Sequence, residues 1–137
     1  MRTFLFAAVV SLFLLSSCSS QQKYTSVIEA MNSEEINIIQ IDSPKEAELN
    51  EIKPLIYKLD NNEIIRVYDF GSQEKRELGY IHFQEQQQFL SSHAPIVYQP
   101  SHLLILYFSN TNSTTQTPKL TETKYGEKIK KALDSLE

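Results

Sequence analysis

Short runs rich in β-branched and aromatic residues alternate with turn residues through the middle of the chain. Residues 36–41 (INIIQI) have the length and composition of a strand. Residues 55–59 and 63–70 are two further runs of this kind, and the DNN segment at 60–62 between them tolerates left-handed backbone. The pattern therefore predicts a strand followed by a β-hairpin.

A second pair of strands is predicted nearer the C-terminus. Residues 94–98 and 102–109 flank a short Gln-Pro-Ser segment that suits a turn. The run LLILYF at 103–108 is apolar throughout, which is typical of a central strand covered on both faces. A polar loop over 110–118 follows it.

Helical features occur in three further segments. Thr25 or Ser26 can cap a short helix that begins near Val27. The SPKE segment at 43–46 has the pattern of a capping box with proline in the first helical position, and it predicts one or two helical turns over 45–52. The last segment carries an amphipathic helical stripe of five residues: Tyr125, Ile129, Ala132, Leu133 and Leu136.

Residues 73–91 fit two structures. Residues 76–83 alternate as a strand would, but the segment continues without a turn signal, and Ser72 suits a helix start. As a helix, it would carry an imperfect apolar stripe of three residues, interrupted by Glu85: Leu78, Ile81 and Phe89. We predict a helix, weakened by about 1 kcal/mol at Gly79.

The predicted order is helix, strand, strand, strand, helix, strand, strand, helix. Hairpin-linked strands beside peripheral helices are typical of the α+β class. We therefore expect residues 24–137 to form a single α+β domain. Its mostly antiparallel sheet would have about five strands, with two or three helices packed on one face.

The first 17 residues have the three parts of an export signal. Arg2 gives a positive flank, residues 4–15 (FLFAAVVSLFLL) are almost wholly apolar, and Ser16 and Ser17 are small. A transmembrane helix needs about 20 apolar residues to cross a bilayer. The apolar segment is too short for that, so we predict a cleaved signal over residues 1–17.

The four residues Leu15, Ser16, Ser17 and Cys18 resemble the lipobox of bacterial lipoproteins. The resemblance implies that the Cys18 thiol receives a diacylglycerol, that the chain is cut before Cys18, and that an N-acyl chain such as palmitate can follow. Two acyl chains hold a protein durably at a membrane, whereas one does so only marginally. Residues 18–23 would form a polar tether. Cys18 is the only cysteine, so the domain would contain no disulfide.

The net negative charge of the predicted mature chain, residues 18–137, limits which classes of partner it can bind. Residues 18–137 contain 12 basic and 17 acidic residues. An acidic, exported domain is a poor candidate for binding nucleic acid. The chain also lacks a basic patch next to the anchor that would hold it flat on anionic lipid, so the covalent lipid would do the holding.

Candidate chemical residues are few. The three histidines, His82, His93 and His102, lack the spacing of a zinc site, although His82 and Glu85 would share a helix face. The chain has no G-x-S-x-G motif, and the run from Ser91 to His93 is interpreted as a chance adjacency. Five tyrosines could line a groove for a peptide or glycan, but ordinary half-buried sheet positions are favoured: Tyr57, Tyr68, Tyr80, Tyr98 and Tyr107.

The mature part also has a loose resemblance to small uncharacterised lipoproteins of Bacillus-type bacteria. Four features carry it: Lys53 to Tyr57, Arg66 to Phe70, the apolar run Leu103 to Phe108, and the closing helix. The resemblance implies a fold and a location but no activity and no cofactor.

The function expected from the sequence is that of a non-enzymatic, lipid-anchored binding module on the extracytoplasmic face of the cell membrane, with an envelope protein or peptide as partner. The alternative is a small envelope hydrolase or metal-binding protein that uses His82, Glu85, His93 and His102. A purely structural spacer is a third hypothesis.

Overall fold

The computed structural model describes residues 22–89 and 93–136. The predicted signal, the lipobox residues Leu15, Ser16, Ser17 and Cys18, and most of the predicted tether lie outside this part of the chain. Ser91 and Ser92 also lie outside it.

A five-stranded sheet forms the centre of the domain, with the order β1-β2-β3-β5-β4. The strands are β1 (Ile38–Ile41), β2 (Leu55–Leu59), β3 (Ile64–Asp69), β4 (Ile96–Tyr98) and β5 (Leu103–Phe108). Every neighbouring pair is antiparallel. The predicted α+β class and the predicted strand count are therefore confirmed.

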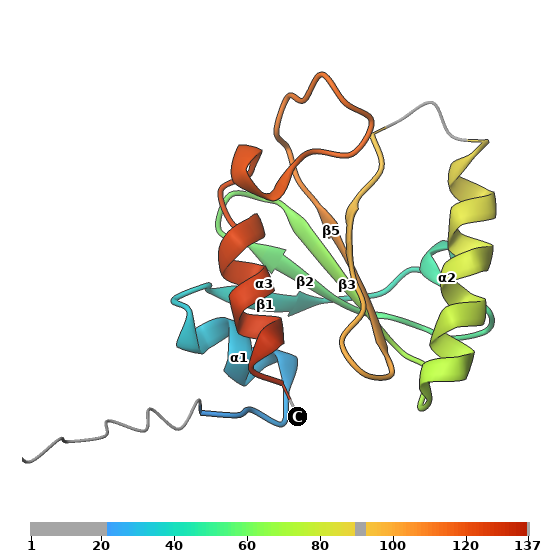
Figure 1. Ribbon diagram of the computed structural model, residues 1–137, viewed down its shortest axis with the longest axis horizontal. Helices are drawn as coiled ribbons and strands as arrows, with labels where there is room; N and C mark the ends of the chain where they lie inside the picture. Colours follow the sequence, from blue (N-terminus) through green and yellow to red (C-terminus); the bar gives the residue numbers. More distant parts are fainter. Residues whose placement is uncertain (1–21, 90–92, 137) are drawn as a thin grey trace, which may run out of the picture.

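Three α-helices cover the sheet: α1 (Val27–Ser33), α2 (Gln73–Gln87) and α3 (Gly126–Asp134). Two short 3-10 turns, η1 (Lys45–Ala47) and η2 (Leu120–Glu122), lie in the connections. Helices α1 and α3 pack together on one face, and α2 covers the other (Figure 1). Two helices thus share a face as expected, and the third adds a layer on the opposite side.

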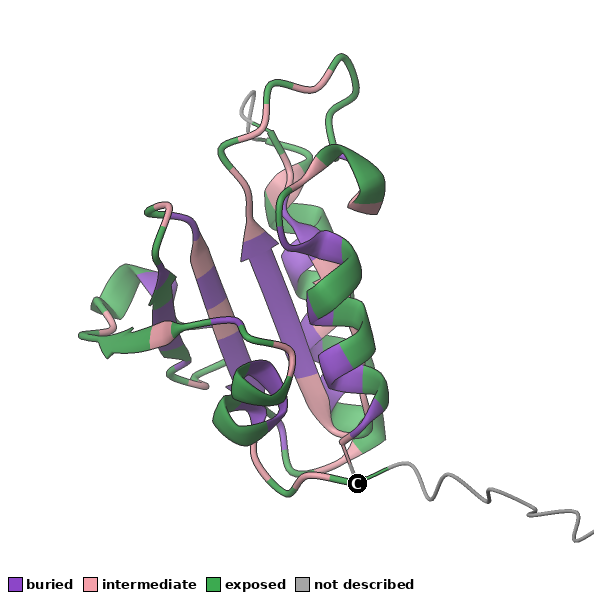
Figure 2. Cartoon of the chain, turned by 90° about the vertical axis from the view of Figure 1, so that its left-hand side faces the viewer, coloured by how far each residue is buried: buried purple, intermediate pink, exposed green. Residues whose placement is uncertain are grey.

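Strand β5 is buried on both faces, as its apolar sequence predicts (Figure 2). Leu104 and Leu106 point toward the α2 layer, where they form a cluster with Phe70 and Phe83. Ile105 and Tyr107 point toward α1 and α3. Successive side chains of a strand alternate between its faces, so this one strand contributes to both cores.

The β2–β3 hairpin turns where the sequence predicts, with Asn62 in the left-handed region at φ 65°. The neighbouring Asp60 accepts a hydrogen bond of 2.5 Å from the Tyr125 hydroxyl, at the start of α3. This hydrogen bond, followed by the attraction of Lys124, lowers the pKa of the Asp60 carboxyl below its usual 3.8. The turn is thereby tied to the α3 layer.

The predicted helical turns over 45–52 are wrong beyond Ala47. The capping box does not form, because Pro44 rather than Ser43 precedes η1 and no side chain caps it. The chain then makes a tight turn in which Asn50 and Glu51 both have positive φ. That turn pairs the backbones of Leu49 and Ile52, and it directs Leu49 into the core beneath α2.

The predicted stripe on α2 is also wrong, although the helix itself is confirmed. The helix ends at Gln87, earlier than predicted, so Phe89 lies beyond it. Leu78, Ile81 and Phe89 are 58%, 50% and 87% exposed, so they face solvent. The inward face of α2 instead carries Arg76, Gly79 and Phe83. An apolar count cannot detect this face, because one of its members is charged and another has no side chain.

At Gly79 the backbone of α2 lies directly against the ring of Phe70. A Cβ added there would overlap the ring of Phe70, which is itself only 6% exposed and stacked on Tyr68. Glycine therefore lets the aromatic ring pack directly against the helix backbone. Gly79, which the sequence predicts to weaken the helix, is therefore required for the packing of Phe70.

We expect Gly79→Ala to destabilise the domain by about 1–2 kcal/mol, because the overlap with Phe70 outweighs the gain in helix propensity. Urea unfolding of the purified protein measures this. Leu78→Ala is the matched control on the exposed side of α2 and should change stability by less than about 0.5 kcal/mol. The double variant with Gly79→Ala and Phe70→Leu should lose less free energy of unfolding than the sum of the two single losses. A stabilising Gly79→Ala would contradict the packing argument.

Candidate functional site

A cleft of about 500 Å³ opens at the end of the sheet where the chain enters the domain. We call it the N-terminal cleft. Its walls come from the start of α1, Gln40 of β1, the segment 52–57, the end of β3 and the β4–β5 turn, and Leu136 also lines it. Six segments far apart in the sequence therefore meet there.

Local interactions at both ends of the chain place the rim of this cleft. The backbone N–H of Tyr24 donates to the Ser135 carbonyl at 2.9 Å, and Tyr24 and Leu136 form a parallel bridge. Ser26 caps α1, as its position in the sequence predicts, by accepting a 3.2 Å hydrogen bond from the Glu29 N–H. Thr25 and Ser26 are thereby held at the mouth of the cleft.

The interior of the N-terminal cleft is mainly apolar. Ile28 and Leu55 line it and remain 40% and 48% exposed. Tyr57 lies behind them at 3% exposure, and burial raises the pKa of its phenol above the usual 10.0. That hydroxyl stays protonated at neutral pH and is a donor as well as an acceptor.

Charged and polar groups lie at the rim. Lys53, Asp69 and His102 all line the N-terminal cleft. Asp69 Oδ1 lies 3.4 Å from His102 Nε2 and also accepts a 2.8 Å hydrogen bond from the Gly71 N–H. A ligand in the cleft would meet an apolar interior and charges of both signs at the opening.

Ser101, His102 and Asp69 form a chain of contacts, since the Ser101 hydroxyl lies 3.2 Å from His102 Nδ1. In a working catalytic triad the acid is buried and orients the imidazole. Here the Asp69 side chain is 66% exposed and the His102 side chain 40% exposed. Ser101 and His102 are also adjacent in a surface turn, so the contacts orient these groups only weakly.

The structure does not bring the predicted metal or acid–base residues together. His82 contacts the side chains of Asn50 and Gln86 on the outer side of α2, and Glu85 is exposed on the same helix. His93 contacts the Ser113 carbonyl in a different loop. Across residues 22–89 and 93–136, no three histidine or carboxylate side chains gather as metal ligands would.

Three of the five tyrosines, Tyr57, Tyr68 and Tyr107, are sheet residues as favoured from the sequence, but they are fully buried rather than half-buried. Tyr68 and Tyr107 are buried, and their hydroxyls donate to the Ala47 carbonyl and to Glu63. The Tyr98 hydroxyl donates to the Gly126 carbonyl at 3.0 Å, and burial is the main cause of its raised pKa. Tyr80 lies on α2 rather than in the sheet; it is half-buried and lines a second hollow.

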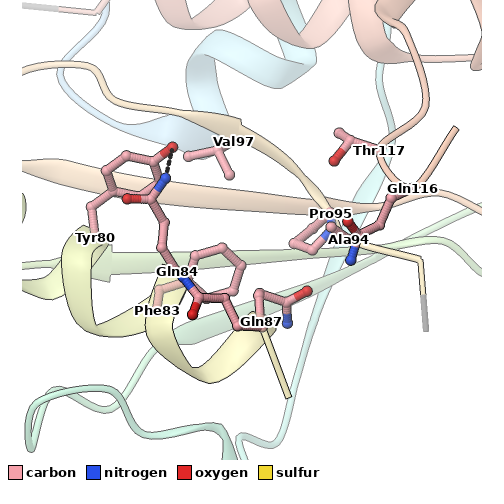
Figure 3. A pocket seen from close by; sticks show the side chains of 10 residues that line it. Tyr80, Phe83, Gln84, Gln87, Ala94, Pro95, Val97, Gln116 and Thr117 are labelled. Atoms are coloured by element: carbon pink, nitrogen blue, oxygen red, sulfur yellow. Dashed lines mark hydrogen bonds between the residues drawn. The ribbon is translucent and has the colours of Figure 1, made fainter. Parts of the chain in front are cut away.

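This second hollow, which we call the amide-lined pocket, has a volume of about 280 Å³ and lies between α2 and the segments 94–97 and 116–117 (Figure 3). Four glutamines line it: Gln84, Gln87, Gln88 and Gln116. The Ala94 N–H donates to the Gln116 carbonyl at 2.9 Å and joins the two segments opposite the helix. The glutamine-rich run QEQQQ at 84–88 is the sequence feature that marks this pocket, and none of the sequence-based predictions of a site included it.

No helix within the described part of the chain is long and apolar enough to cross a membrane. No protein-family model, curated protein or solved structure matches this sequence.

Because the histidines are dispersed, we expect metal chelation to leave the stability of the protein unchanged. The thermal midpoint of the untagged protein should move by less than about 1 °C on adding EDTA or zinc, since only a ligand that binds the folded state shifts it. The thermal midpoints of His82→Ala and His102→Ala should likewise not respond to EDTA or zinc. A zinc-dependent rise in the midpoint that either substitution removes would favour the metal-binding alternative.

Proposed function

We propose that this protein is a lipid-anchored binding module that holds its N-terminal cleft close to the outer surface of a cell membrane. The observation that carries the proposal is the position of Thr25 and Ser26, which line the cleft where the chain enters the domain. The predicted lipid attachment at Cys18 lies only a short distance before them in the sequence.

The length of the tether limits the distance between membrane and cleft. Five residues, 19–23, separate the lipid attachment at Cys18 from Tyr24. A fully extended chain spans about 3.5 Å per residue, so the tether reaches about 20 Å at most. A partner bound in the cleft would therefore lie at the membrane surface, within reach of other membrane proteins or lipid-linked molecules.

The composition of the cleft favours binding over catalysis. Ligand sites are typically apolar hollows with a few polar groups that fix orientation. The N-terminal cleft has this character, with Ile28 and Leu55 inside and Lys53, Asp69 and His102 at the opening. The weak orientation of Ser101 and His102 gives the hydrolase alternative little support.

The lipid anchor is tested by the mass of the N-terminus in protein purified from bacterial membranes. We expect the chain to begin at Cys18 and to carry a diacylglycerol, because the thiol is the group that lipidation requires. Cys18→Ser should remain an uncleaved precursor that retains residues 1–17. Ser17→Ala, which keeps a small residue before the cut, should be processed normally. A wild-type chain with an intact N-terminus, or with an unmodified Cys18, would contradict the proposal.

Binding through the cleft is tested by site-specific photo-crosslinking in intact membranes. A photoreactive residue at Leu55, which is 48% exposed and lines the cleft, should give a discrete covalent adduct. The matched control is the same residue at Ile39 in the edge strand β1, which is 71% exposed and does not line the cleft. We expect no adduct from position 39. Equal adducts from both positions, or none from position 55, would contradict a binding role for the cleft.

A further inference from the structure

The amide-lined pocket differs from the rest of the surface in its charge. None of its ten lining residues is acidic or basic. Charged residues make up 22% of the chain, so ten positions of average composition would carry about two charges. The chemistry of this pocket therefore favours a ligand without charge.

Side-chain amides supply the polar groups of the pocket. Gln84 and Gln87 come from α2, and Gln116 comes from the opposite loop (Figure 3). Gln88, which also lines the pocket, is the residue directly after the helix. Each amide offers two N–H donors and one carbonyl acceptor on a single planar group. Such groups match ligands whose neighbouring hydroxyls both donate and accept hydrogen bonds.

One of these amides has an unused acceptor. Gln87 Oε1 is buried and has no hydrogen-bond partner among the described residues. A buried polar atom without a partner costs free energy, and a rotation of the Gln87 amide toward a ligand hydroxyl in the pocket would remove that cost. Gln84 is partly engaged already, since its amide donates to the Tyr80 hydroxyl at 3.1 Å (Figure 3).

Apolar groups form the remainder of the lining. Tyr80, Phe83 and Pro95 lie among the glutamines and offer flat surfaces to the C–H face of a ring. The pocket volume of about 280 Å³ is just below the usual range for small-molecule sites, about 300–1,000 Å³. This size suits one or two sugar rings.

We infer that the amide-lined pocket binds an uncharged saccharide, with Gln87 and Gln116 as its main hydrogen-bonding residues. An extended peptide is a weaker fit, because peptides that add to a sheet bind mainly through the backbone of an edge strand. The polar groups that converge here belong to side chains. The inference goes beyond the proposed function and does not depend on the lipid anchor or on the N-terminal cleft.

The test is NMR of the full-length, isotope-labelled protein in a zwitterionic detergent that contains no sugar. The probes are two neutral oligosaccharides, N-acetylglucosamine tetrasaccharide and maltotetraose. At least one should shift the side-chain amide signals of Gln84, Gln87, Gln88 and Gln116 in a saturable way. Gln116→Ala and Gln87→Leu should each weaken its affinity at least tenfold. Gln86→Ala is the matched control, because Gln86 is a glutamine of the same helix that does not line the pocket.

Three results would overturn the inference. The first is the absence of saturable shifts with both neutral probes. The second is an equal loss of affinity in Gln86→Ala, which would place binding elsewhere on α2. The third is a preference for tetragalacturonate or for a capped alanine pentapeptide, which would show that the pocket selects an acidic sugar or a peptide. The backbone amide spectrum of each variant shows whether it is folded, so a loss of affinity cannot be confused with unfolding.

Discussion

The architecture depends on the burial of β5 from both sides. Four successive residues of this strand, Leu104 to Tyr107, are at most 1% exposed. Apolar side chains on both faces of a strand require a cover on both faces, because the hydrophobic effect penalises either face in water. Helices α1 and α3 supply one cover and α2 supplies the other. With two layers in place, each face of the sheet retains a hollow where its cover ends.

Hydrophobic pattern and turn chemistry were enough to predict the five strands and the three α-helices of this fold. The LLILYF run identified β5, and the turn at Asn62 identified the β2–β3 hairpin, because both depend on local sequence. The face that α2 buries could not be predicted in the same way. Its inward residues include Gly79, which is there for its lack of a side chain, and Arg76, which is there for its hydrogen bonds. An apolar count selects the exposed Leu78 instead.

The candidate sites were harder to predict from the sequence than the fold was. The lipobox is contiguous, so four neighbouring residues were enough to predict it. The N-terminal cleft and the amide-lined pocket are assembled from segments that only the tertiary structure brings together. Gln87 and Gln116 are 29 positions apart, and no spacing rule relates them. The three histidines were candidates because of their chemistry alone, and only His102 lines either of these two hollows.

Helix α2 links the two hollows, although they lie on opposite faces of the sheet. Arg76, near its first turn, is 5% exposed and donates from Nη1 to the carbonyls of Gln99 and Ser101, the former at 2.8 Å. These carbonyls belong to the β4–β5 turn, which forms part of the rim of the N-terminal cleft. A buried guanidinium is stable only when such acceptors surround it, so the turn and the helix hold each other in place. The other end of α2 supplies Gln84 and Gln87 to the amide-lined pocket. The geometry of both sites therefore depends on how this one helix packs against β5.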